Sequence, residues 1–180
     1  MRAALVLLAI LNPFDMALSQ HHSSSPYAGL ESRQIKSLSE TQITDLKQGR
    51  GAGLALTAEL NGYPGPVHAL ELAAQLDLTE AQRKAMEQLL AAMRAEAIPL
   101  GETLIEQEAA LDHQFATRTI TAASLMDRAR EIALTQGALR AAHLKYHLAT
   151  EGALTPSQVA AYVQRRRYGS RSAQHQHKAH

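Results

Sequence analysis

Two histidines four residues apart, His143 and His147, are the residues whose type and spacing most clearly suggest chemistry. On an α-helix this spacing places both rings on the same side, about 6 Å apart along the helix axis. Imidazole is a common ligand of divalent transition metals, so the pair offers two ligands for one ion. His143 also falls on an apolar stripe, and a core histidine without a ligand role is the alternative interpretation.

A hairpin of two long helices is expected to position this pair. From Thr79 to about Phe115, apolar residues recur at spacings of three and four, which predicts a long amphipathic helix with a bend at Pro99. After a short turn, Thr121 opens a second long helix whose apolar face includes His143. We expect the two helices to pack antiparallel.

The predicted topology brings other ligand types to the same few helical turns. A turn before the first long helix places His68 opposite Glu87, and the hairpin brings both near the histidine pair. We therefore predict a nitrogen-rich site formed by His143, His147 and His68, with Glu71 or Glu87 as a carboxylate ligand. Zinc, nickel, cobalt or copper suits such a site.

Composition narrows the classes of protein. With 180 residues, 46% hydrophobic and only 4% aromatic, the chain fits a thin domain built by aliphatic packing of helices. The net charge of +1 gives no reason to expect a nucleic-acid partner, and the run 165–167 of three arginines is interpreted as a charged helix end. Cysteine is absent, which excludes disulfides and thiolate ligands. Since no phosphate loop or nucleophile with a supporting base is evident, we do not expect an enzyme.

The N-terminus is typical of a secreted protein. A positive start, a short apolar run and small residues at the cleavage spacing predict a signal peptide over residues 1–19. An uncleaved membrane anchor is the alternative, but Asn12, Pro13 and Asp15 interrupt the run before the roughly 20 apolar residues that a span requires. No later segment is predicted to cross a membrane.

The mature chain divides into four parts. Residues 20–26 form a polar linker, and residues 27–66 contain short helices followed by a turn rich in proline and glycine. Ser39 and Gln42 form a predicted capping box for the first of these helices. Residues 67–168 form the main helical domain, and residues 169–180 a disordered tail that contains histidines.

The pattern Leu-Thr-x-x-Gln occurs twice, at residues 78–82 and 154–158. Each copy is a helix start, in which the threonine hydroxyl accepts from a first-turn amide and the glutamine reaches back as a capping box. Two copies in an alanine-rich chain with a secretion signal resemble the LTxxQ family of bacterial periplasmic proteins. This family includes the Spy and CpxP chaperones, the zinc resistance-associated protein and the heavy-metal sensors. The resemblance covers about residues 65–167.

The resemblance implies an all-α fold: a thin bundle of about four to five helices with a long antiparallel central hairpin, periplasmic and expected to form a homodimer. The heavy-metal sensors of this family bind metal through an early histidine pair, a carboxylate, and a later histidine and methionine four residues apart. Here Leu72 stands where a partner for His68 is expected, and His147 replaces the methionine. Only His143 and His147 carry over from the family's pattern.

Three functions are therefore compatible with the sequence. The first is a periplasmic metal-binding protein that resembles heavy-metal sensor or resistance proteins. The second is a Spy/CpxP-like chaperone or envelope-stress regulator that binds unfolded proteins without ATP. A long thin hairpin cannot bury both of its faces, so spare apolar surface is expected to meet a partner. The third is a helical module that docks on an envelope signalling protein.

Overall fold

The computed structural model describes residues 25–176, with side chains described as far as Arg166. The predicted signal peptide, most of the predicted linker and residues 177–180 lie outside this range. The all-α prediction is confirmed, since the described residues contain helices and no strand beyond an isolated bridge between Ile35 and Leu38. None of the described helices is long and apolar enough to cross a membrane. In chain order the elements are a 3-10 helix Leu30–Ser32, α1 Glu40–Lys47, α2 Leu56–Leu60, α3 Pro66–Glu71, α4 Glu80–Ala116, α5 Ala122–Gly152 and α6 Pro156–Gln176.

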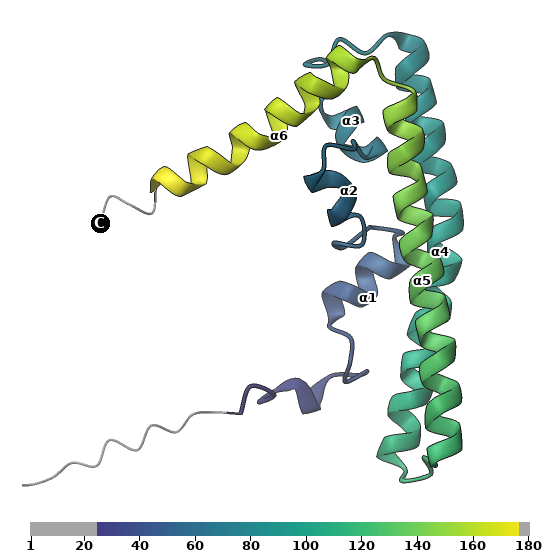
Figure 1. Cartoon of the computed structure of the whole chain (residues 1–180). Helices are drawn as coiled ribbons and strands as arrows, with labels where there is room; N and C mark the ends of the chain where they lie inside the picture. The colour runs from purple at the N-terminus through teal and green to yellow at the C-terminus, as the bar shows by residue number, and fades with distance from the viewer. Residues whose placement is uncertain (1–24, 177–180) are drawn as a thin grey trace, which may run out of the picture.

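The long central hairpin is formed by α4 and α5, which run side by side over most of their length (Figure 1). The two helices begin after Thr79 and Thr121, as the sequence predicts, and each of these residues forms a capping box. Helix α4 continues through Pro99 as a single element. The seam between the helices buries four apolar residues: Ala97, Leu104, Ile132 and Leu139.

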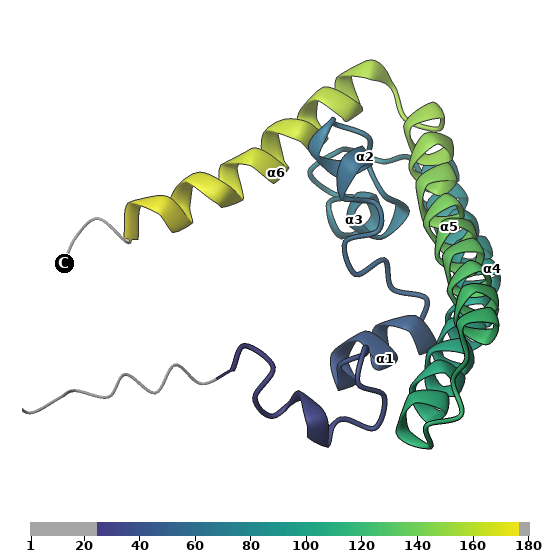
Figure 2. The ribbon, with the colours of Figure 1, turned by 60° about the horizontal axis from the view of Figure 1, so that its bottom comes forward.

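The second core lies where the last helix leaves the hairpin. Here α6 turns away from α5 at an elbow, with α2 and α3 on its inner side (Figure 2). The buried residues of this cluster come from α3, the turns, α4 and α6, namely Ala69, Ala73, Leu76, Leu78, Met86, Leu154 and Tyr162. Helix α6 continues to Gln176, past the end predicted near Arg167. The arginine run therefore lies within the helix rather than at its end, and residues 169–176, predicted as tail, are helical.

The two Leu-Thr-x-x-Gln motifs are joined at this elbow. Each glutamine caps its own helix and also reaches the other motif: Gln82 Nε2 donates to Gln158 Oε1 at 2.8 Å, and Gln158 Nε2 donates to Gln82 Oε1 at 3.0 Å. The same two amides also donate to the carbonyl oxygens of Ala153 and Leu76. The motif thus ties the start of α4 to the start of α6.

Residues 35–65 form a separate layer, which we call the N-terminal strap. It lies on the same side of the hairpin as α6, and we call this side the concave face (Figures 1 and 2). Within the strap, α1 contacts α4 and α2 contacts α5. The approach is close at Gly101, where an added Cβ would lie 2.6 Å from the carbonyl oxygen of Leu46. Only glycine lets the strap backbone lie directly on α4 at this point.

Candidate functional site: a polar pocket at the elbow

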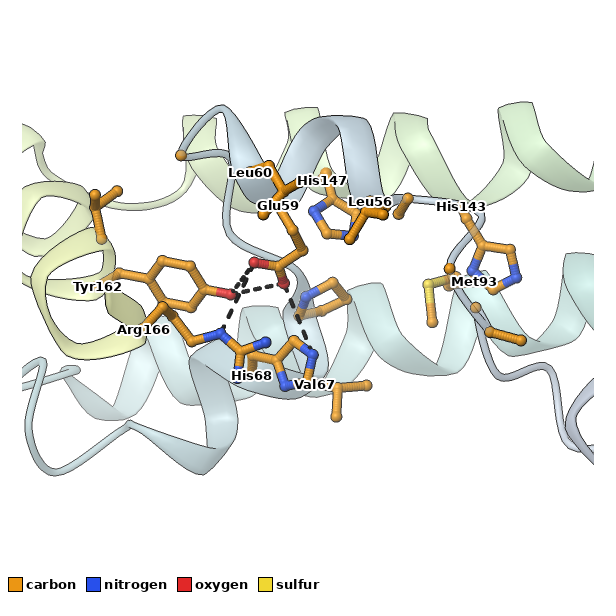
Figure 3. Close-up of a pocket in the computed structure, with 17 residues that line it drawn as sticks. Leu56, Glu59, Leu60, Val67, His68, Met93, His143, His147, Tyr162 and Arg166 are labelled. Carbon is orange, nitrogen blue, oxygen red and sulfur yellow. Dashed lines mark hydrogen bonds and ion pairs between the residues drawn. The ribbon is translucent and has the colours of Figure 1, made fainter. Parts of the chain in front are cut away.

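A pocket of about 490 Å³ opens on the concave face between the strap, α3, α5 and α6. The three histidines that the sequence singled out, His68, His143 and His147, all line it (Figure 3). The rest of its lining is mainly small or apolar: Gly51, Ala52, Gly53, Ala55, Leu56, Leu60, Gly62, Pro66, Val67, Met93 and Val163, with Glu59, Tyr162 and Arg166 as further polar residues.

Glu59, on α2, is the polar centre of the pocket (Figure 3). The hydroxyl of Tyr162 donates to both carboxylate oxygens, at 2.7 and 2.8 Å. Arg166 Nε lies 3.9 Å from Oε2 and His68 Nε2 lies 3.7 Å from Oε1. Burial, and then the bond to Glu59, raise the pKa of Tyr162 above its ordinary value, so the phenol stays protonated as a donor. The strap is thereby joined to α6.

His147 is held in one orientation by the strap. Its Nδ1 lies 2.9 Å from the carbonyl oxygen of Tyr63, and because a carbonyl only accepts, Nδ1 carries the proton. The other nitrogen, Nε2, faces a small space beside Gly65. A Cβ at Gly65 would lie 3.0 Å from this Nε2 and 3.6 Å from Glu59 Oε1. The free nitrogen of His147 and the carboxylate of Glu59 therefore border the same space.

His143 lies at the opposite end of the pocket from Tyr162, next to Met93 (Figure 3). The residue is only 2% exposed, and its Nε2 has no hydrogen-bond partner among the described residues. Burial, and secondarily the neighbouring His147, lower the pKa of His143 below its ordinary value. The ring is therefore held neutral, and a buried polar atom without a partner costs free energy in the folded state.

Three of the five predicted metal ligands line the pocket, a fourth contacts one of these three, and the fifth does not line the pocket. His68, His143 and His147 share the pocket, and Glu71 Oε2 lies 2.8 Å from Nδ1 of His68. Glu87 is exposed on α4 and does not line the pocket. In the described part of the chain, no three His, Asp or Glu side chains are placed so that together they could hold one metal ion.

The polar centre of the pocket is not predicted by the sequence. Tyr162 and Arg166 are four residues apart on α6, a spacing that puts them on one side of the helix, but an arginine run by itself indicates a charged helix end. Glu59 lies in a short helix without a recognisable motif. Its role depends on a contact between residues 103 positions apart, which no local pattern reveals.

Comparison with known proteins places the chain in a family. Residues 68–166 match the model of the family described as "LTXXQ motif family protein". The strap lies outside the matched region. No curated protein and no solved structure matches the chain. The matched region covers more than half of the sequence and contains both motifs and the hairpin between them. The chain therefore belongs to the LTXXQ motif family, a Spy/CpxP-like family associated with the periplasm.

Proposed function

We propose that this protein is a Spy/CpxP-like periplasmic chaperone that binds apolar segments of incompletely folded proteins on its concave face. The observation that carries the proposal is the apolar surface exposed around the pocket. Leu60 is 72% exposed and Leu56 is 55% exposed, both on the strap at the rim of the pocket. Adjacent exposed leucines around a concave site are typical of a protein-binding surface.

The thinness of the fold supports the same function. Its apolar interior is divided into two small clusters, one at the elbow and one along the hairpin seam. A pocket of about 490 Å³ has room for a few aliphatic side chains of a client. Burying apolar surface contributes roughly 25 cal/mol per Å² without any nucleotide, so such binding needs no energy source.

An aggregation assay tests this proposal. The mature protein, at equimolar ratio, is mixed with a reduced globular client, and light scattering is followed with time. We expect the wild type to suppress scattering and the double variant Leu56→Ser/Leu60→Ser to lose most of this effect. Phe115→Ser is the matched control, because Phe115 is 55% exposed but lies near the end of α4 and does not line the pocket. Equal protection by the double variant, or none by the wild type, would contradict the proposal.

Metal binding is the second candidate, and one observation favours it. His68 and His147 each have Nδ1 held by an acceptor, Glu71 Oε2 and the Tyr63 carbonyl, while both Nε2 atoms lie near Glu59. Metal-binding histidines are oriented in this way by their other ring nitrogen. Zinc, nickel, cobalt or copper would need these donors to move closer, with Glu59 released from Tyr162.

Calorimetric titration of these four metals into the protein tests the second candidate. We expect His68→Ala and His147→Ala each to weaken binding about tenfold or more, whereas Glu87→Ala, on the exposed side of α4, leaves it unchanged. Equal affinity in all three variants would exclude the pocket as the metal site.

The expected homodimer also stays a proposal, and α5 offers a surface for it. Met126, Leu134 and Leu148 are 62%, 69% and 59% exposed, on the side of α5 opposite its buried residues. Met126 and Leu148 lie at equal distance in sequence from Gly137, so an antiparallel second copy would pair each with the other. Light scattering should give a dimer mass for the wild type and a monomer mass for Leu134→Glu.

A further inference from the structure

We propose that the pocket binds a lysine side chain of the client, with the ammonium group at Glu59. This inference rests on the proposed chaperone function and names the chemical class of side chain that the pocket prefers. The primary ammonium of lysine carries three hydrogen-bond donors and no acceptor. The polar groups beside Glu59 have the opposite need, because they offer acceptor sites that the donors among the described residues do not fill.

The carboxylate of Glu59 has unused acceptor capacity. A carboxylate can accept about four hydrogen bonds. From the described residues it receives two, both from the hydroxyl of Tyr162. Arg166 Nε at 3.9 Å and His68 Nε2 at 3.7 Å lie beyond hydrogen-bond distance. Because the side chain of Glu59 is only 16% exposed, little bulk water reaches the remaining acceptor sites.

His147 supplies a second acceptor next to this carboxylate. Since Nδ1 donates to the carbonyl of Tyr63, Nε2 of the neutral ring has a free lone pair. This Nε2 and Glu59 Oε1 border the same small space. Figure 3 shows Tyr162 and Arg166 on the other side of the carboxylate. An ammonium group between His147 and Glu59 can therefore donate to both without displacing Tyr162, and Glu59 separates it from the cation of Arg166.

The acceptors suit an ammonium group as they stand, whereas a metal ion requires them to move. Transition metals hold nitrogen and oxygen ligands at about 2.0–2.2 Å, while an N–H donor reaches its acceptor at about 2.7–3.2 Å. No three His, Asp or Glu side chains in the described part of the chain are close enough together to hold one metal ion. Hydrogen bonds to an ammonium group span the wider spacing.

The walls of the pocket suit the aliphatic stem of lysine. The aliphatic residues of the lining include Leu56, Leu60, Val67 and Val163. Lysine can bury its four methylene groups along apolar surface while its charged end reaches a polar group. The segment that carries Glu59 is fixed by its neighbours, since Ala55 and Pro64, on either side of α2, are both buried. The site is therefore formed before a client binds, which lowers the entropic cost of binding.

Matched peptides test this inference on the unmodified protein. The probes are four fluorescent peptides that share one leucine-containing sequence and differ at a single central position, which is lysine, Nε-acetyl-lysine, norleucine or glutamate. Affinity is measured by fluorescence anisotropy in EDTA, so that metal ions do not contribute. We expect the lysine peptide to bind about tenfold tighter than the acetyl-lysine peptide, because acetylation removes the charge and two of the three donors. Equal affinity for lysine and norleucine overturns the inference.

One substitution removes the charge of the site while keeping its shape. Glu59→Gln retains a carbonyl acceptor for Tyr162, and we expect it to abolish the preference for lysine over acetyl-lysine without changing the affinity for norleucine. Glu87→Gln is the matched control, since it makes the same change of charge at an exposed position outside the pocket. This control should keep the wild-type preference. A lysine preference that survives Glu59→Gln, or that is lost in Glu87→Gln, overturns the inference.

The lysine site and the chaperone function fail in different ways. Leu56→Ser/Leu60→Ser should weaken the binding of all four peptides and leave the ratio between lysine and acetyl-lysine unchanged. Binding that is equal for all four peptides refutes the lysine site and leaves the chaperone function in place. If no peptide binds, the lysine site is refuted, and the aggregation assay decides whether the chaperone function fails with it.

Discussion

The paired glutamines of the two motifs and the histidine-lined pocket differ in how fully their polar groups are satisfied. In the pair, Gln82 and Gln158 bond to each other and to two backbone carbonyls, so both side-chain amides have partners. In the pocket, the buried Nε2 of His143 has no described partner. A complete network stabilises one arrangement, whereas an incomplete one leaves capacity for a ligand or a change of partner.

This difference separates the family motif from the candidate site. The residues of the motif open helices and join the elbow, and none of them lines the pocket. The pocket is built from positions outside the motif, several of them on the strap, which the family match does not cover. The family motif therefore accounts for the scaffold of this chain but not for what its pocket binds.

The largest expected loss in the free energy of unfolding is at the glutamine pair. Gln82→Leu removes an acceptor of the partly buried Gln158 side-chain amide. It also removes the capping hydrogen bond that the Thr79 backbone amide donates to Gln82. We expect it to lower the free energy of unfolding by about 2–3 kcal/mol in urea titrations, since unsatisfied polar groups and lost caps each cost about 1 kcal/mol or more.

A double-mutant cycle sharpens this prediction. Gln82→Leu/Gln158→Leu should cost less than the sum of the two single changes, because the second substitution removes a group that the first left unpaired. Gln88→Leu, at an exposed position on the same helix, is the control. Strict additivity would mean that the two amides do not depend on each other.

A smaller loss in the free energy of unfolding is expected at the polar centre of the pocket. Tyr162 is 1% exposed, and Tyr162→Phe removes both of its bonds to Glu59 while keeping the ring in the core. We expect a loss of about 1.5 kcal/mol in the free energy of unfolding, because the acceptor is charged but keeps Arg166 nearby.

The control for this change is Tyr27→Phe, whose side chain is 72% exposed. It should leave the free energy of unfolding within about 0.5 kcal/mol of the wild type. A similarly small effect of Tyr162→Phe would show that the contact between Glu59 and α6 contributes nothing to stability.

The smallest expected effect is a pH dependence that originates at His143. Its pKa is lowered in the folded protein by burial, so as pH falls through 6.5 the unfolded chain binds a proton that the folded protein does not. The contribution of His143 to stability is therefore present above pH 6.5 and is lost below it. Thermal midpoints measured between about pH 7.5 and 5.5 should fall on acidification, and less so in His143→Gln.

His113→Gln provides the comparison, since His113 is exposed near the end of α4. This variant should follow the wild-type dependence on pH. If His143→Gln follows it too, the buried ring does not control the acid sensitivity of the fold.

The sequence predicted the helical scaffold well because helix caps and apolar spacing depend on residues a few positions apart. The capping boxes at Ser39, Thr79 and Thr121 begin helices where predicted, and the spacing of His143 and His147 puts both on the pocket side of α5. Local patterns were less reliable at a helix end. Helix α6 continues past the arginine run, which by its composition indicates a charged helix end.

By itself, then, the sequence determined the helices, the long hairpin and the family, since caps and apolar periodicity act between residues a few positions apart. Only the tertiary structure decided which polar groups meet. Glu59 with Tyr162, Gln82 with Gln158 and His147 with the Tyr63 carbonyl are pairs from distant parts of the chain. Their geometry depends on how the strap and α6 close over the hairpin, and a shift of one helical turn in that packing would change every partner.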